Sequence, residues 1–246
     1  MIKSQKQMLW DKFKEHFHES WHDVMRPFIE SEECDEIYAF LKSEGRRGKK
    51  IAPLSSNTYR CFKETPLDKM KAVLLGMCPY HTQLNGLPVA DGLLMGCSIT
   101  DKLQPSLEQF YNAVEKDFYK GLNLKYKKNT NVEYLAEQGV LMLNAALTTE
   151  INKAGSHLKI WETFIKYVFE NAIAPSRVPV VFLGKEASKF KRYMPPLTWS
   201  FELSHPASAS YKNADWDSEG VFTKVNRVLK DENKLEIHWL DEDLPF

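Results

Sequence analysis

The chain has 246 residues, of which 43% are hydrophobic and 12% aromatic. This size and composition suit one large α/β domain or two small ones, and they exclude an intrinsically disordered chain. Because 33 basic residues balance 33 acidic ones, no overall positive field favours a nucleic-acid partner. Basic clusters at 44–50, 120–128 and 185–192 are typical of solvated surface, although several of them around one cleft would hold phosphates.

The first part of the chain predicts helices. Between residues 5 and 43, Trp10, Phe13, Phe17 and Trp21 recur at helical spacing, and a second pattern stops at Gly45. A loop follows to about residue 63. Four apolar runs then predict strands, at 71–76, 139–144, 178–184 and 199–204. The first three runs are apolar on both faces, which is typical of a parallel sheet buried between helices.

Helical patterns separate these runs. We expect helices at 106–118 (with Ser106 as its cap), 131–139, 160–173 and 219–230. Strands that alternate with helices predict an α/β fold, a single three-layer αβα sandwich with a central four-stranded, mostly parallel sheet. The whole chain, 1–246, is expected to form one domain, with 1–50 as an N-terminal helical extension packed on it.

Distinctive residues follow each predicted strand. Gly-Met-Cys-Pro-Tyr-His occupies 76–81, Asn144 and Gly184 end the next two strands, and Ser-His-Pro-Ala-Ser-Ala-Ser occupies 204–210. Ligands of open α/β sheets bind at the carboxyl ends of the strands. These four segments are therefore expected to meet at one rim and to form a site.

Several motifs resemble one known family, the uracil-DNA glycosylases of the main type. Residues 76–81 resemble the family's water-activating loop, GQDPYH. Further segments match in order and spacing: VADGLLM at 89–95, QPSL at 104–107, LMLNAALT at 141–148, GSHLKIWETF at 155–164, VVFLGKEA at 180–187 and SHPASAS at 204–210. The likeness covers about residues 51–240, and it implies the glycosylase fold and excision of uracil, or a related pyrimidine, from DNA in base excision repair.

That chemistry requires a base flipped into a pocket and a hydrolysed N-glycosidic bond. The resemblance implies that Asn144 reads the uracil edge, because a carboxamide offers both a donor and an acceptor. It implies that Tyr80 fills the space beside C5 and excludes thymine. It also implies that a neutral His205 donates a hydrogen bond to the departing base, where negative charge develops. Met77 and Met95 are expected against the base, with Met95 at the family's stacking phenylalanine.

The residues expected to contact DNA follow from the same motifs and from backbone N–H groups near phosphates. They are Gln104, Pro105, Ser106, Gly184, Lys185, Ser208, Ala209, Ser210 and Tyr211. The family inserts a leucine where this chain has Ala209, and alanine is a poor wedge. Tyr211 is the alternative, and a weak wedge would suit single-stranded DNA.

Cys78 replaces the family's catalytic aspartate. A free thiol is mostly neutral at pH 7, and loss of one preorganised electrostatic group costs about 10²–10³ in rate. Cys78 therefore positions water weakly or attacks the sugar as a thiolate. Alternatively, Asp91 supplies the missing carboxylate from another wall of the pocket.

Three functions remain open at the sequence level. The first is an active uracil excision enzyme with weak or altered activity, and the second is an impaired relative that binds single-stranded or uracil-containing DNA. The third is a glycosylase for another modified base in phage DNA or anti-phage defence. The four cysteines, at positions 34, 61, 78 and 97, have no metal-binding spacing, so we expect no metal and no cofactor. We also expect a cytoplasmic monomer without a membrane span, and a DNA-mimic inhibitor protein is a possible partner.

Overall fold

The computed structural model describes residues 5–120, 128–196 and 198–241, so most of the basic cluster at 120–128 lies outside the described residues. Its centre is a four-stranded sheet in the order β5-β2-β7-β8. The strands are β2 (Ala72–Gly76), β5 (Val140–Asn144), β7 (Val180–Leu183) and β8 (Ser200–Leu203). Every neighbouring pair is parallel. The predicted α/β fold is confirmed, and each strand lies within its predicted run.

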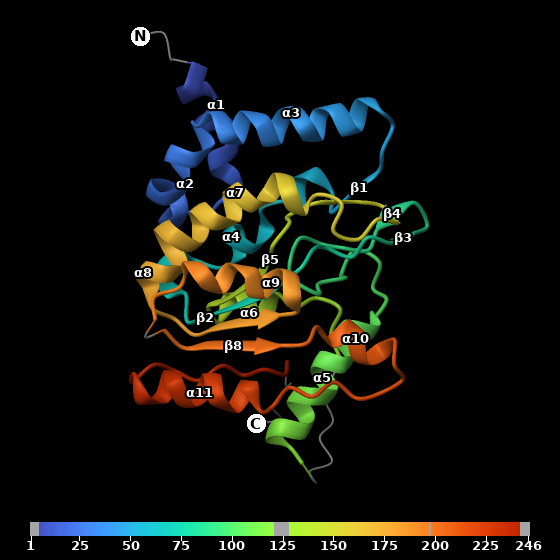
Figure 1. The fold of residues 1–246 in the computed structure, drawn as a ribbon, viewed down its shortest axis with the longest axis vertical. Coiled ribbons are helices and arrows are strands. Elements are labelled where there is room, and N and C mark those ends of the chain that lie inside the picture. The colour runs from blue at the N-terminus through green and yellow to red at the C-terminus, as the bar shows by residue number, and fades with distance from the viewer. Residues whose placement is uncertain (1–4, 121–127, 197, 242–246) are drawn as a thin grey trace.

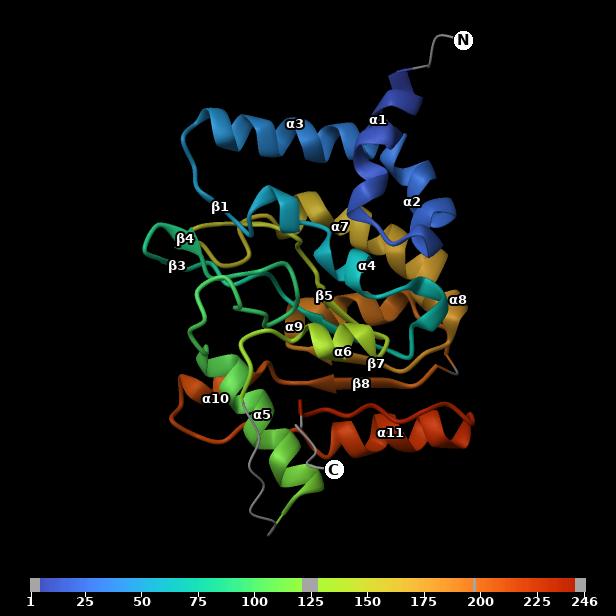
Figure 2. The same cartoon turned by 180° about the vertical axis from the view of Figure 1, so that it is seen from behind.

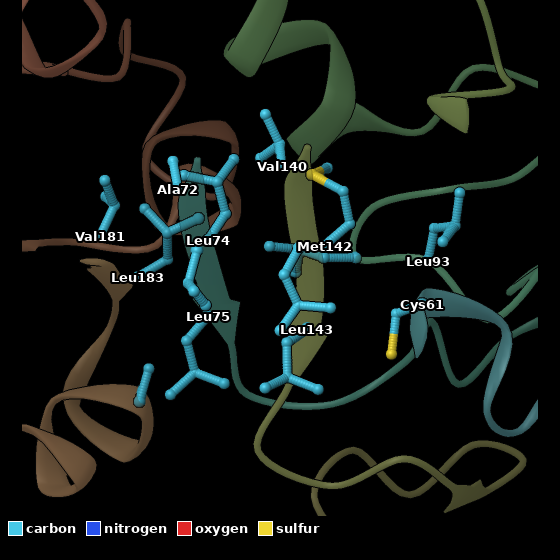
Figure 3. Close-up of a cluster of buried hydrophobic side chains, with 14 of the residues drawn as sticks. Cys61, Ala72, Leu74, Leu75, Leu93, Val140, Met142, Leu143, Val181 and Leu183 are labelled. Atoms are coloured by element: carbon cyan, nitrogen blue, oxygen red, sulfur yellow. The ribbon is translucent and has the colours of Figure 1, made fainter. Parts of the chain in front are cut away.

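The three strands with uninterrupted apolar sequence are buried along their whole length. β2 and β5 are in register, with Leu74 opposite Met142 and Leu75 opposite Leu143. Figure 3 shows these side chains along the two adjacent strands, within a cluster of buried apolar residues. β8, at the edge of the sheet, is only partly buried. Burial of apolar surface stabilises a fold by about 25 cal/mol per Å². The observed order is therefore favourable, because it covers the three apolar strands and leaves the more polar β8 at the exposed edge.

Eleven α-helical segments lie within the described residues. They are α1 (Gln5–Phe13), α2 (His22–Ile29), α3 (Glu32–Arg46), α4 (Arg60–Glu64), α5 (Pro105–Phe118), α6 (Glu133–Glu137), α7 (Leu158–Val168), α8 (Ala174–Ser176), α9 (Lys185–Ser188), α10 (Pro206–Ser210) and α11 (Val221–Asp231). Helix α9 lies in front of the sheet in Figure 1 and α6 lies in front of it in the reverse view of Figure 2. The sheet is therefore the middle of three layers. None of the described helices is both long and apolar enough to cross a membrane.

Two short antiparallel ribbons complete the fold. β1 (Ile51–Ala52) pairs with β6 (Thr149–Glu150), and β3 (Gln83–Leu84) pairs with β4 (Leu87–Pro88). The second ribbon follows the loop after β2 and lies on the side toward which the strands of the sheet point (Figure 1). It turns through Asn85 and Gly86, both with positive φ, as tight hairpins require.

The N-terminal helices pack directly on the rest of the protein. The Trp21 ring lies 5.0 Å from Phe62, which lies 5.7 Å from Phe164 of α7. The Trp21 indole N–H also donates to the carbonyl of Thr65 at 2.7 Å. At the other end of the extension, Glu44 of α3 is buried and pairs with Lys49. The extension therefore shares the aromatic core.

Some helix ends differ from the predictions. Ser106 does not cap its helix, because α5 begins at Pro105 with Gln104 as the N-cap residue, and Gln104 makes no side-chain capping bond. Helix α3 continues one residue beyond Gly45, and the chain turns at Gly48, which has a φ of 74°. The segment predicted at 160–173 is helix α7 followed by a π-helical turn, Phe169–Ile173.

Candidate active site

A cavity of about 740 Å³ lies at the carboxyl edge of the sheet. In Figure 1 the arrow of β8 points toward the side that carries α10 and the β3–β4 ribbon. The cavity is lined by segments that follow three of the four strands, together with the start of α5. From the sequence-predicted site these are Met77, Cys78, Tyr80, Met95, Gln104, Pro105, Ser106, Gly184, Lys185, His205, Ser208, Ser210 and Tyr211. The expected convergence is therefore observed for three of the four strand ends, and Asn144, at the end of β5, does not line the cavity.

The loop after β2 is held against the end of β5. The backbone N–H groups of Ala145 and Ala146 donate to the carbonyls of Gly76 and Met77, at 2.9 and 3.0 Å. Gly76 leaves room for its neighbours, because a Cβ atom there would lie 2.3 Å from the end of the Leu94 side chain and 3.1 Å from the Asn144 Oδ1, and Leu94 would have to move. This anchoring fixes the backbone from which Cys78 and Tyr80 extend.

Cys78 is partly buried and faces the cavity. Its sulfur accepts the backbone N–H of Gly155 at 3.3 Å. Burial raises the pKa of the Cys78 thiol, and the Gly155 hydrogen bond opposes this only in part. Because burial has the larger effect, the thiol is favoured in its neutral form, which argues against attack by a thiolate, the form that acts as nucleophile.

His205 is oriented by its own helix. It is the N-cap residue of α10, and its Nδ1 accepts the backbone N–H of Ala207 at 3.1 Å. An accepting Nδ1 leaves the proton of a neutral ring on Nε2. Burial lowers the pKa of His205 to about 4, so the ring is neutral at pH 7. Gly184 allows the approach, since a Cβ atom on it would lie 3.3 Å from the His205 Cβ.

Asn144 ends β5 beside Gly76 of β2 and is 3% exposed. It is not among the residues that line the cavity. Within the described residues, its buried Oδ1 has no hydrogen-bond partner. A buried acceptor without a donor costs about 1–3 kcal/mol. A ligand N–H that reached this oxygen would recover that free energy.

Tyr80 and Met95 form two walls of the cavity. The Tyr80 hydroxyl lies 2.6 Å from the Oγ of Ser106. Met95 is almost fully buried and has a φ of 60°, a left-handed conformation that is unusual outside glycine. Backbone strain of this kind concentrates at functional sites.

The structure does not bring Asp91 to the cavity, which corrects the expectation that it faces the pocket. Its side chain is fully buried, and one carboxylate oxygen lies 3.0 Å from Arg60. The same carboxylate accepts the N–H of Leu93 and both the N–H and the hydroxyl of Ser98. These contacts fix the loop from Asp91 to Ser98, which contains Met95, and join it to Arg60 of α4, so Asp91 has a structural role.

Ala209 is also displaced from its expected position. It is 7% exposed and does not line the cavity, so it offers no side chain to a DNA duplex. Tyr211, at the end of α10, is 85% exposed and borders the cavity. Ser106 is buried as well, which is unlike a residue that contacts phosphate. Of the rim residues proposed for DNA, Lys185 carries the positive charge.

The sequence interpretation missed several residues. Leu94 and Glu186 line the cavity. Glu186 is the one carboxylate among the described lining residues, and it pairs with Lys189 at 2.6 Å. Gly155 donates its N–H to the Cys78 sulfur. It lies in the segment at 155–164 that resembles the family, but the sequence of this segment does not indicate the contact. No group of three or more metal-ligating side chains occurs within the described ranges.

The fold and the cavity together define an α/β protein with a parallel sheet whose candidate site is a cavity of about 740 Å³ at the strand ends. No protein-family model matches the chain. It is 31% identical to the uracil-DNA glycosylase of Azotobacter vinelandii over 224 residues, 89% of this chain and 92% of that protein. It is 32% identical to that of Azobacteroides pseudotrichonymphae, over 90% and 97%. The chain therefore belongs to the uracil-DNA glycosylase family.

Solved structures show the same fold. The crystal structure of mimivirus uracil-DNA glycosylase superposes with a TM-score of 0.80 at 23% identity, and it covers 97% of this chain and 94% of that one. A variant of the mimivirus protein in complex with UGI gives the same TM-score and identity, over 97% and 96%.

Proposed function

We propose that this protein excises uracil from DNA by flipping the base into the cavity and hydrolysing the N-glycosidic bond. The observation that carries the proposal is the orientation of His205. Its ring is neutral, its Nδ1 is occupied by the Ala207 N–H, and its remaining proton is on the nitrogen free to donate. A neutral donor stabilises the negative charge that develops on a departing uracil.

Asn144 supports uracil as the base. Uracil presents an N–H next to a carbonyl, and the unpartnered Asn144 Oδ1 is an acceptor for such an N–H. The other amide atom, a donor, suits the neighbouring carbonyl. Binding would thus satisfy a buried group that is left without a partner in the free protein.

Cys78 favours a second candidate, a protein that captures uracil in DNA but cleaves it slowly. The oxocarbenium-like sugar needs a negative charge beside it, and the neutral thiol supplies none. Glu186 is tied to Lys189 and Asp91 is turned away. Without that charge, catalysis would depend on the His205 hydrogen bond to the departing base, on a water molecule positioned by the loop at 76–81, and on the free energy of binding the flipped base. The excision rate is therefore expected to be low.

Tyr80 bears on the third candidate, a larger modified base. Its ring lines the cavity and its hydroxyl is bonded to Ser106. A ring held in this way leaves little space for a large substituent on C5 of a pyrimidine. Uracil is therefore favoured over a base with a bulky 5-substituent.

The rim supports DNA as the partner. Lys185 and the α10 segment border the cavity, and Tyr211 extends into solvent beside it. We propose that a protein inhibitor with DNA-like charge would cover the same rim, as the UGI complex of the mimivirus protein suggests.

The test is cleavage of single-stranded and duplex oligonucleotides that carry one uracil, followed by alkali. Strand breaks at uracil from the wild type establish excision. Asn144→Ala is expected to abolish uracil-specific binding and cleavage. Asn226→Ala is the matched control, because Asn226 is also buried but bonds to the backbone of Ile237, away from the cavity. Binding of uracil-DNA without breaks would favour the second candidate, and equal binding of uracil and thymine DNA would contradict both.

A further inference from the structure

Tyr80 reaches across from the loop after β2 to the first turn of α5. Its hydroxyl lies 2.6 Å from the Ser106 Oγ. Ser106 is 2% exposed, so its side chain is enclosed. Within the described residues, the Tyr80 hydroxyl is the one hydrogen-bond partner of the Ser106 side chain.

The first turn of α5 has backbone N–H groups that its own N-cap residue does not bond. The first N–H groups of a helix have no partner within the helix. Gln104, the N-cap residue, makes no capping bond, and Pro105 has no N–H. The Ser106 hydroxyl opposes the rise in the pKa of Tyr80 that burial causes, and the Leu107 N–H acts in the same direction. The Tyr80 hydroxyl is therefore anchored to the first turn of α5 through the Ser106 side chain.

Helix α5 is itself fixed to the rest of the site. The Ser210 hydroxyl of α10 donates to the Pro105 carbonyl at 3.4 Å. Gln109 of α5 accepts the backbone N–H of Trp216, whose indole donates to the carbonyl of Ser204, next to His205. The partner that holds Tyr80 is therefore a rigid element connected to the segment that carries His205.

We propose that Ser106 is a positioning residue that fixes the Tyr80 ring and thereby sets the discrimination between uracil and pyrimidines substituted at C5. This inference rests on the proposed function, since it concerns the same base site. A phenol ring held only by packing can rotate or tilt, whereas one bonded at its far end cannot do so without breaking that bond. Rejection of a base with one extra methyl group corresponds to a specificity of about 10–200-fold. This rejection requires a pocket wall that does not move when the methyl group presses against it.

The experiment compares oligonucleotides carrying uracil or thymine, in a cleavable form and in a 2′-fluoro form that resists cleavage. The measured quantity is the ratio of the two affinities, and the ratio of kcat/KM where cleavage occurs. The variants are Ser106→Ala, Tyr80→Phe and the double variant. Ser218→Ala is the control, because it removes another buried serine hydroxyl at the opposite end of α5, bonded to Asp117.

Each single variant is expected to reduce the preference for uracil by about tenfold. The double variant is expected to change the preference no further, because both substitutions remove the same bond. Ser218→Ala is expected to leave it unchanged. A Ser106→Ala protein with the wild-type preference, or additive effects of the two substitutions, would overturn the proposal. If the wild type binds uracil selectively but produces no abasic sites, the proposed excision activity is wrong. The proposal for Ser106 is still tested in that case, because the ratio of the two affinities does not depend on cleavage.

Discussion

The Cys78 sulfur accepts the Gly155 N–H at 3.3 Å, and no free carboxylate stands beside it among the described residues that line the cavity. A carboxylate at position 78 would find the same donor in place. A hydrogen bond from a backbone N–H favours the ionised form of an acid. The backbone is therefore already arranged for a charged group that the sequence does not supply.

Cys78→Asp is expected to raise the rate of uracil excision by about 10²–10³, since it restores one preorganised charge. Single-turnover cleavage of a uracil oligonucleotide measures this. Cys78→Asn is the matched control, because it has nearly the same shape but no charge, and it should stay near the wild-type rate. The Asp variant should also gain activity as the pH rises through the pKa of its carboxyl group, a dependence that the Asn variant should lack. Equal rates for both variants would show that charge at this position is not limiting.

His205 makes stability depend on pH. Burial lowers its pKa from 6.5 to about 4, so between these values the unfolded chain takes up a proton that the folded protein does not. The His205 contribution to the free energy of unfolding is therefore complete above about pH 6.5 and is lost as the pH falls through about 4. His205→Asn keeps an N-cap acceptor and removes the titration. Urea unfolding from pH 4 to 8 should show a steeper acid loss for the wild type than for this variant, and parallel curves would contradict the assignment.

Asp91→Asn tests the structural role of Asp91. Removing one partner of a buried ion pair costs about 3–5 kcal/mol, and Arg60 would lose its buried partner. We expect a large fall in the free energy of unfolding, and a wild-type rate of excision per folded molecule at low temperature. Glu133→Gln removes a more exposed partner of the same arginine and should cost less than about 1 kcal/mol. Loss of excision in a fully folded Asp91→Asn protein would restore Asp91 as the catalytic acid.

Tyr211 is expected to act on duplex DNA. Tyr211→Ala should lower excision from duplex by about tenfold relative to single strands, because an aromatic ring stacked on a base is worth about 1–3 kcal/mol and flipping from a single strand needs less help. Lys212→Ala is the control: it removes an exposed positive charge next to Tyr211, and because such a charge attracts the phosphates of either substrate, binding of both substrates should weaken alike. The ratio of duplex to single-strand kcat/KM separates the two effects. An unchanged ratio for Tyr211→Ala would exclude a wedge at this position.

The sheet could be predicted from the sequence because its signal is local. Three runs are apolar on both faces, and each proved to be a buried strand. Strand ends of a parallel sheet share one edge, so the meeting of Cys78, Gly184 and His205 followed from topology alone.

Features that depend on distant partners could not be predicted. Whether Asp91 faces a pocket or a salt bridge depends on Arg60, 31 residues earlier, and nothing near Asp91 indicates that pairing. The burial of Ala209 depends on the packing of α10 against α5, and it is this packing that leaves Tyr211 exposed. The bond between the Tyr80 and Ser106 hydroxyls likewise joins two segments that are 26 residues apart in the sequence.

The burial of Glu44 has a practical consequence. From α3 its carboxylate lies 3.9 Å from His157, which follows Gly155 in the loop before α7, and Lys49 pairs with both Glu44 and Glu150 of β6. A shortened protein confined to residues 51–240, the span that resembles the family, would lack this brace under the donor of the Cys78 sulfur. Rates measured on such a fragment would describe a loosened loop, so variants are best compared in a protein that keeps residues 1–50.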